Sequence, residues 1–220
     1  MPPIRRPIPR FMADASVEGL PYGRWAQRLR DEFAKACERL VAEAGGPPGE
    51  LTWFPERTWG GRVYVPAVAP VEGAAEPSEY FGFVSFVRTD LDEGGEAGDF
   101  DARADFTDVT ADQNPDWMID LNEEVVGSWR GEGDRRGDVT LVWGTPLIPS
   151  AVAATAELDA EVVDQTPVSD ERFTLIAVDA VKGFADELYL EVKIWSSQGQ
   201  QLAAESLYEE PESPPPAGSG

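Results

Sequence analysis

The fold is decided by residues 187–195, which read Glu-Leu-Tyr-Leu-Glu-Val-Lys-Ile-Trp. Apolar side chains alternate there with charged ones: Leu188, Leu190, Val192 and Ile194 against Glu187, Glu191 and Lys193. Successive side chains of a strand point to opposite faces of its sheet, so this pattern predicts a strand with one dry face and one wet face. Because sheets with one wet face are usually antiparallel, we expect an antiparallel sheet.

The same alternation extends over residues 50–208, which we interpret as one β domain. Candidate strands are residues 51–54, 62–69, 80–89, 101–109, 122–131 and 138–143, with three or four more before residue 208. In residues 154–163 we expect Thr155, Glu157, Asp159 and Glu161 to face outward. Ser-Ser-Gln-Gly-Gln at 196–200 predicts a hairpin turn. The fold class is therefore mainly β, an antiparallel sandwich or barrel of eight to ten strands. The alternative is a curved sheet around a helix, as in cone-shaped or hot-dog folds.

One amphipathic helix precedes the β domain, at residues 23–46. Its apolar residues recur at helical spacing: Trp25, Leu29, Phe33, Cys37, Leu40, Val41 and Ala44. This stripe predicts a helix with one core-facing side. The sequence Gly-Gly-Pro-Pro-Gly at 45–49 ends it, because glycine and proline interrupt helices.

Two terminal segments are expected to lack regular structure. Residues 1–22 contain prolines at short intervals, which restrict the preceding residues to extended geometry, so we interpret them as an extended Pro/Arg arm. Residues 209–220 are rich in proline, serine, glycine and acids, and we expect a disordered tail.

Charge is unevenly distributed along the chain. Residues 1–30 contain six arginines and two acidic residues, a net charge of +4, whereas residues 31–220 contain 39 acidic and 12 basic residues, a net charge of −27. The anionic body disfavours binding to nucleic acid or to an anionic membrane. We expect Arg5, Arg6 and Arg10 of the arm to contact an acidic surface of a protein partner or of a second copy. The alternative is a terminus without function.

The absence of histidine and the single cysteine exclude several chemistries. Ser-His and Cys-His nucleophile pairs, histidine-held metals and thiolate clusters all need residues that this chain lacks. Cys37 cannot form an intramolecular disulfide, and its place on the helix predicts a buried thiol. No stretch approaches the roughly 18 apolar residues of a membrane span, and no secretory signal is evident, so we expect a cytoplasmic protein.

The most acidic segment is residues 90–138, with sixteen acids and four arginines. Within it, five oxygen-bearing residues hold positions 1, 3, 5, 9 and 12 of a twelve-residue frame: Asp112, Asn114, Asp116, Asp120 and Glu123. This spacing resembles the calcium loop of EF-hand proteins and implies Ca²⁺ as a ligand. The resemblance is incomplete, because Trp117 holds the position that needs glycine and Pro115 precedes it. The competing interpretation is a solvated acidic loop.

Three functions are compatible with these features. We favour a non-enzymatic acidic interaction or assembly protein that acts as an oligomer or as a subunit of a larger complex, because charge of opposite sign lies on separable segments and no catalytic group of residues is evident. Trp59 and Trp117 are its candidate partner contacts, along with the arm. One alternative is a small-molecule-binding domain with carboxylate-based isomerase or hydratase activity. The other is a carbohydrate-binding β-module, because the chain has seven tryptophans.

Overall fold

The computed structural model describes residues 25–88, 97–130, 136–158, 160–178 and 190–207. They form two short helices, α1 (Ala26–Cys37) and α2 (Val41–Ala44), and a short 3-10 turn, η2 (Ala111–Gln113). The strands are β1 (Thr52–Trp53), β2 (Arg57–Trp59), β3 (Arg62–Pro70), β4 (Glu79–Arg88), β5 (Ala97–Thr107), β6 (Ile119–Arg130), β7 (Arg136–Pro146), β8 (Ala151–Leu158), β9 (Glu161–Pro167), β10 (Phe173–Val178), β11 (Leu190–Ser196) and β12 (Gln201–Ser206). The predicted arm and tail lie outside the described residues.

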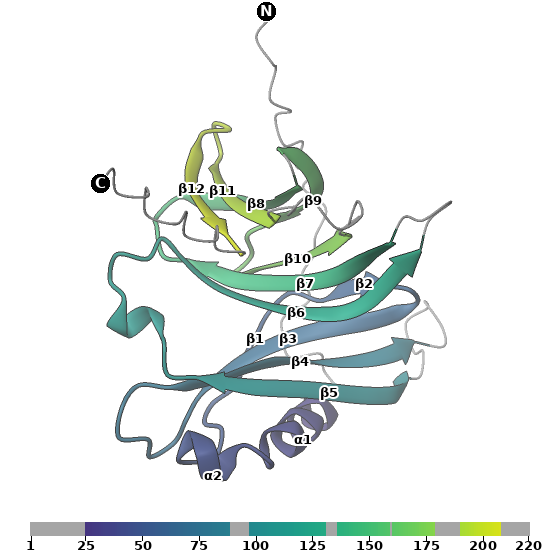
Figure 1. Cartoon of the computed structure of the whole chain (residues 1–220), viewed down its shortest axis with the longest axis vertical. Helices are drawn as coiled ribbons and strands as arrows, with labels where there is room; N and C mark the ends of the chain where they lie inside the picture. Colours follow the sequence, from purple (N-terminus) through teal and green to yellow (C-terminus); the bar gives the residue numbers. More distant parts are fainter. Residues whose placement is uncertain (1–24, 89–96, 131–135, 159, 179–189, 208–220) are drawn as a thin grey trace, which may run out of the picture.

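The strands form three sheets, and every strand pair among the described residues is antiparallel. The first sheet has the order β1-β3-β4-β5, with β2 also paired to β3; the middle sheet is β10-β7-β6; the outer sheet is β12-β11-β8-β9. Figure 1 shows them stacked in that order, with α1 beneath the first sheet. The predicted fold class, mainly β and antiparallel, is confirmed. The sheets form three layers, whereas a single sandwich has two.

The first sheet has apolar neighbours on both faces, which explains the nearly continuous apolar sequence of β3 and β4. Val63 and Val65 point toward α1 and join Leu29 and Phe33 in one core cluster. Tyr64 points the other way and packs with Leu141 and Trp143 of the middle sheet, in a second cluster. Strands buried on both faces need apolar residues at consecutive positions.

The middle sheet is buried on both sides in the same way. Trp143 faces the first sheet, while Val142, Phe173 and Leu175 face the outer sheet and meet Val192 there. Trp143 is completely buried. The middle sheet is therefore the centre of the molecule, because one of its faces packs on the first sheet and the other on the outer sheet.

The predicted single helix is interrupted. α1 ends at Cys37, and α2 begins at Val41 after a turn in which the Leu40 N–H donates to the Cys37 carbonyl over 2.8 Å. Arg39, in this turn, donates from Nη2 to the Ala104 carbonyl of β5 at 3.0 Å. The prediction of one continuous helix was wrong, because the turn at residues 38–40 separates α1 from α2. The predicted stop is confirmed, since Gly45 caps α2 with a φ of 89°.

Cys37 is buried, as predicted. It lies in the core cluster between α1 and the first sheet. Burial raises the pKa of its thiol to about 12, although the charge of Arg39 acts in the opposite direction. The thiol therefore stays protonated at neutral pH, which makes it a packing residue rather than a nucleophile.

The expectation for residues 154–163 was wrong for the single strand and for Thr155 and Glu157; Glu161 is exposed as expected, and Asp159 lies outside the described residues. Residues 154–163 do not form one strand: β8 ends at Leu158 and β9 begins at Glu161, with Ala160 at a φ of 64° in the turn. Thr155 and Glu157, expected to face water, are buried, and so is Lys193 on the neighbouring β11. Their polar groups have partners within the outer sheet. Lys193 pairs with Glu157, and the Trp195 Nε1–H donates to Thr155 Oγ1 at 2.8 Å.

The hairpin predicted at residues 196–200 is confirmed. Gly199 has a φ of 72°, and the Ser196 N–H donates to the Gln200 carbonyl at 2.9 Å.

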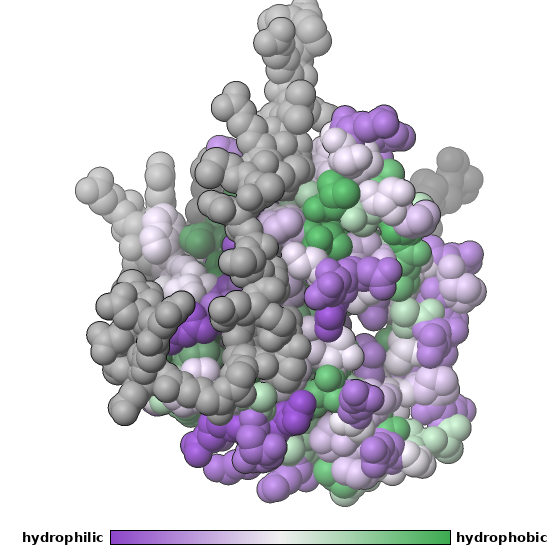
Figure 2. All heavy atoms as spheres, turned by 180° about the vertical axis from the view of Figure 1, so that it is seen from behind, coloured by the Kyte–Doolittle hydropathy of each residue, from purple (hydrophilic) through white to green (hydrophobic). Residues whose placement is uncertain are grey.

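No helix among the described residues is long and apolar enough to cross a membrane. Figure 2 shows the molecule from behind; on the described part of this face, hydrophilic side chains are mixed with small apolar groups.

Candidate functional site

An acidic cleft of about 550 Å³ lies at one end of the first sheet. Its walls come from the end of β3 at Pro70, from residues 74–79, from Thr110–Asp112 around η2, and from Asp120 on β6. Strand register brings these together, because Glu79 is opposite Pro70 on β3 and opposite Thr107 on β5. The chain then crosses from β5 to β6 through the loop that carries η2, on the left of Figure 1. We call this cavity the acidic cleft.

Three carboxyl groups influence one another in the acidic cleft. Burial raises the pKa of Glu79 to about 7, and the negative charges of Asp120 and Asp112 add to the effect. Burial also raises the pKa of Asp120, again with a contribution from Asp112. Both shifts have the sign expected for carboxylates that lose water and lie near like charge. A cation placed among them would reverse the repulsion and lower these pKa values.

Thr110, in the wall of the acidic cleft, caps the turn η2. It is 7 % exposed, and it forms a reciprocal capping box with Gln113 at the start of η2. Its N–H donates to Gln113 Oε1 at 3.4 Å, and its carbonyl accepts from Asn114 Nδ2 at 2.9 Å. Its Oγ1 is buried, so Thr110 holds the shape of the loop and does not offer its hydroxyl to the cleft.

Beside the acidic cleft, four large apolar side chains are exposed to solvent. We call them the loop-end surface: Val109 (53 % exposed), Trp117 (37 %), Met118 (47 %) and Leu147 (43 %). Met118 and Leu147 are neighbours, because the Leu147 N–H donates to the Met118 carbonyl at 2.9 Å. Trp117 is fixed by its N–H, which donates to the Asn114 carbonyl at 3.0 Å. Exposed acids at Asp108, Asp112 and Asp116 belong to the same loop.

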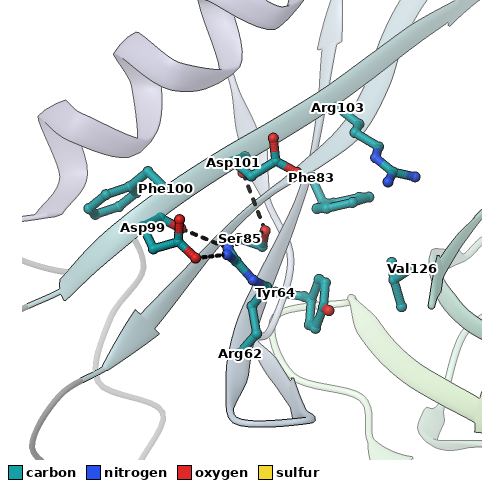
Figure 3. Close-up of a pocket in the computed structure, with 9 residues that line it drawn as sticks. All are labelled: Arg62, Tyr64, Phe83, Ser85, Asp99, Phe100, Asp101, Arg103 and Val126. Atoms are coloured by element: carbon teal, nitrogen blue, oxygen red, sulfur yellow. Dashed lines mark hydrogen bonds and ion pairs between the residues drawn. The ribbon is translucent and has the colours of Figure 1, made fainter. Parts of the chain in front are cut away.

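A second pocket, of about 370 Å³, opens between the first sheet and β6 (Figure 3). Tyr64 and Phe83 pack edge to face, with ring centroids 5.6 Å apart, and Val126 faces them from β6. Arg62 donates to Ser85 Oγ at 3.1 Å and pairs with Asp99. Arg103 pairs with Glu124 at 3.3 Å. Because both arginines already have carboxylate partners, this pocket offers an anion no free cation.

The residues of the calcium-loop spacing do not converge on one point. Asp112 and Asp120 line the acidic cleft, whereas Asn114 uses its side chain to cap the turn around η2. Glu123 lies farther along β6, where burial and the nearby Glu124 raise its pKa. The second half of the twelve-residue frame is thus a strand, which extends the ligands along a line instead of around an ion. Within the described ranges, no group of three acidic, histidine or cysteine side chains is arranged to hold a metal ion.

The candidate partner contacts are placed in part. Trp117 is exposed, on the loop-end surface. Trp59 is half-buried and packs on Gly127, where a Cβ would lie 2.7 Å from its ring. Arg5, Arg6 and Arg10 lie outside the described residues. All seven tryptophans are described, and Trp117 is the single exposed one, so the surface has no platform of several exposed tryptophans for a sugar.

Sequence reasoning missed Glu79, Thr110, Met118 and Leu147. Glu79 and Thr110 are ordinary polar residues at a strand start and in a loop, and only strand register brings them beside Asp120. A signal did exist for Met118: two large apolar residues, Trp117 and Met118, stand together in an otherwise acidic, turn-forming segment.

Comparisons with protein-family models, with curated proteins and with solved structures found no match.

Proposed function

We propose that the protein is a non-enzymatic interaction protein that works as an oligomer or as a subunit of a larger complex. The observation that carries the proposal is the loop-end surface. Four of the seven large apolar side chains exposed in the described part of the chain belong to it. Apolar groups gathered at one place on a surface are typical of a contact site, and tryptophan and methionine are enriched in such sites.

The charge around the loop-end surface supports a partner with basic groups. Asp108, Asp112 and Asp116 belong to the same loop, and the acidic cleft adjoins it. Complementary charge raises the association rate and excludes acidic partners, whereas the apolar centre provides most of the affinity. We therefore infer a protein partner that presents basic side chains next to apolar ones.

The test is sedimentation velocity over a concentration series at two salt concentrations. We expect the full-length protein to self-associate and the variant Met118→Ser/Leu147→Ser to associate more weakly. The matched control is Val152→Ser/Val163→Ser, which removes two exposed apolar side chains from β8 and β9 instead. A wild-type protein that stays monomeric at all concentrations would contradict the oligomer. The subunit form is then tested by a photo-crosslinking residue at position 117 in the native cell, where the absence of any crosslinked protein would reject it.

A second candidate function is a small-molecule site in the acidic cleft that uses carboxyl groups as acid and base. The observation that favours it is Glu79, because a carboxyl group with a pKa of about 7 holds or releases a proton near neutral pH. Ligand-observed NMR with a panel of small amines and hydroxy acids tests it. This function requires at least one ligand whose signal is lost in Glu79→Gln; a panel without any binder contradicts it.

A further inference from the structure

We propose that the second pocket, between the first sheet and β6, binds a small neutral molecule with several hydroxyl groups, of the chemical class of monosaccharides. Its volume of about 370 Å³ lies within the range of roughly 300–1,000 Å³ that is typical of small-molecule sites. The pocket shares no lining residue with the acidic cleft or with the loop-end surface. The inference therefore adds a ligand to the proposed interaction function and does not depend on it.

The hydroxyl of Tyr64 is the observation that points to a ligand. Tyr64 is 5 % exposed, yet its hydroxyl makes no hydrogen bond with a described residue. The hydroxyl opens into the pocket, where Val126 of β6 lies opposite (Figure 3). The polar end of a buried tyrosine usually has a hydrogen-bond partner. A hydroxylated ligand in the pocket supplies the partner that the protein does not.

Strand register places two further polar side chains on the same face as Tyr64. Tyr64 on β3 is opposite Ser85 on β4. Ser85 is in turn opposite Asp101 on β5. Arg103 follows two residues after Asp101, so both line the same pocket from one face of β5. Three strands thus bring a phenol, a carboxylate and a guanidinium group to one place.

These groups act on one another through their charges. Burial raises the pKa of Tyr64, the charges of Arg62 and Arg103 act in the opposite direction, and the charge of Asp101 raises it further. The phenol is therefore protonated at neutral pH, and it can both donate a hydrogen bond and accept one.

The pocket offers hydrogen-bonding groups of both kinds. Arg103 donates from Nη1 to Glu124 at 3.3 Å and to the Val125 carbonyl at 3.2 Å, whereas its Nε and Nη2 make no hydrogen bond with a described residue. Among the described residues, the carboxylate of Asp101 likewise accepts no hydrogen bond. A hydroxyl group both donates and accepts. Neighbouring hydroxyls of one ligand can therefore accept from Arg103 and Tyr64 and donate to Asp101.

The balance of charge in the pocket favours a neutral ligand. Two arginines, Arg62 and Arg103, face two acids, Asp99 and Asp101. Arg62 donates from Nη1 to the Asp99 carbonyl at 2.7 Å, and its Nη2 pairs with the Asp99 carboxylate. Neither an anion nor a cation would find an excess of opposite charge here, whereas hydroxyl groups can bond to both signs.

A β-bulge shapes one end of the pocket. The pairing of β4 with β5 changes register between Ser85 and Val87. Asp99 lies opposite this change, with a φ of 52°, and from there it reaches Arg62. Bulges are frequent next to active sites, where they redirect a side chain. The bulge therefore fixes the Arg62 and Asp99 pair at the rim of the pocket.

The aromatic residues favour a sugar over a flat heterocycle. The Arg103 guanidinium lies over the Phe83 ring, 6.0 Å from its centroid. The Tyr64 and Phe83 rings are inclined to each other by 65°. These two rings therefore do not form a parallel pair between which a flat base could stack.

The experiment measures binding of D-glucose, D-galactose, D-mannose and myo-inositol to the full-length protein by saturation-transfer-difference NMR. We expect at least one of the four probes to bind. Tyr64→Phe should weaken that binding by about 2- to 10-fold and Asp101→Asn by about 10- to 100-fold, the ranges for neutral and charged hydrogen bonds. The control, Asp105→Asn, removes an exposed acid of β5 outside the pocket and should bind as the wild type does.

Amide chemical shifts locate the bound probe. They should change at Tyr64, Ser85 and Asp101 and stay constant at Trp117 and Met118, which belong to the loop-end surface. Circular dichroism checks that the variants are folded. Because Asp101 is exposed, its variant tests the site even where Tyr64→Phe lowers stability.

Three results would overturn the proposal. The first is a protein that binds none of the four probes. The second is binding that is equal in the wild type, Tyr64→Phe and Asp101→Asn, because the ligand site would then lie elsewhere. The third is tighter binding of a charged probe, glycine or benzoate, than of any hydroxylated one, because the ligand class would then be wrong. None of these results bears on self-association, which tests the proposed function.

Discussion

Arg57 and Asp164 connect the first sheet to the outer sheet across the edge of the middle one. Arg57 Nη2 on β2 lies 2.7 Å from Asp164 Oδ2 on β9. Between them runs β10, whose Thr174 carbonyl accepts from Arg57 Nε at 3.0 Å and whose Ile176 N–H donates to Asp164 Oδ2 at 2.8 Å. One ion pair thus satisfies backbone groups on the edge strand of the middle sheet and holds three layers in register.

We expect Arg57→Ala to lower the free energy of unfolding by about 2 kcal/mol, because it removes charged hydrogen bonds to two other sheets. Urea unfolding followed by circular dichroism measures this. Arg88→Ala is the control: Arg88 also pairs with a carboxylate, Glu56, at 2.8 Å, but both residues belong to the first sheet and its loop. The control should cost no more than about 1 kcal/mol. Equal losses in the two variants would contradict a special role for the pair between layers.

Glu79 makes stability depend on pH. The folded protein keeps its proton up to about pH 7, whereas an unfolded glutamate loses it near pH 4.5. Between these values the folded state binds more protons, so the free energy of unfolding falls as the pH rises. Glu79→Gln should therefore be more stable than the wild type at pH 8, by about 1–2 kcal/mol, and no more stable at pH 4.

Unfolding curves at pH 4, 6 and 8 test this prediction. Glu205→Gln on β12, an exposed acid, is the control and should change stability little at any of the three pH values. If the free energy of unfolding of Glu79→Gln equals that of the wild type at every pH, the carboxyl group is hydrated in the folded state.

Gly144 allows β6 and β7 to approach closely beside the acidic cleft. A Cβ at this position would lie 2.3 Å from the Asp120 carbonyl. Gly144→Ala should therefore cost about 1–3 kcal/mol, the range for overpacking, and displace Asp120. Gly98→Ala is the matched control in β5, where no atom lies within 4 Å of the added Cβ. Differential scanning calorimetry should show a lower melting temperature for the first variant only.

The buried pair Lys193 and Glu157 gives a fourth prediction. Burial by itself lowers the pKa of Lys193, but the hydrogen bonds that its ammonium donates to Glu157 and Glu191 outweigh this effect and raise the pKa. Lys193→Met leaves the Glu157 carboxylate buried without its cation, which should cost about 3–5 kcal/mol at pH 8.

The double variant Lys193→Met/Glu157→Leu checks the cause. It replaces both charges with apolar groups, and we expect it to recover most of the lost stability in urea unfolding. A double variant as unstable as Lys193→Met alone would show that packing of the lysine stem, and not its charge, stabilises the outer sheet.

Local pattern predicted the type of most elements. Alternation in residues 187–195 predicted a strand, which the structure describes as β11 from Leu190, and the glycine at position 199 predicted the turn after it. The prediction of solvent exposure failed for the polar face of β8 and β11. Thr155, Glu157 and Lys193 have the pattern of a solvated face, yet they are buried, because they form hydrogen bonds and an ion pair with one another. Polarity in sequence does not reveal whether a polar partner is available.

The candidate site was predictable only in fragments. Asp112, Asp120 and Trp117 stood out because acids and a tryptophan are crowded in residues 90–138. Glu79 and Thr110 did not, because nothing in their neighbourhood distinguishes them from other polar residues. They join the site through the pairing of β4 with β3 and β5, and through the loop that crosses to the middle sheet.

The sequence by itself determined that the chain is mainly β and antiparallel, that one helical stripe precedes the strands, and that its anionic body lacks histidine chemistry. These features follow from composition and from the spacing of apolar side chains, which is a pattern among residues close together in the chain. Tertiary structure alone decided that the sheets stack in three layers, that Arg57 and Asp164 join them, and that Glu79, Asp112 and Asp120 share one cleft. Each of these depends on contacts between residues far apart in the chain, and such contacts follow from register and packing, which no local pattern contains.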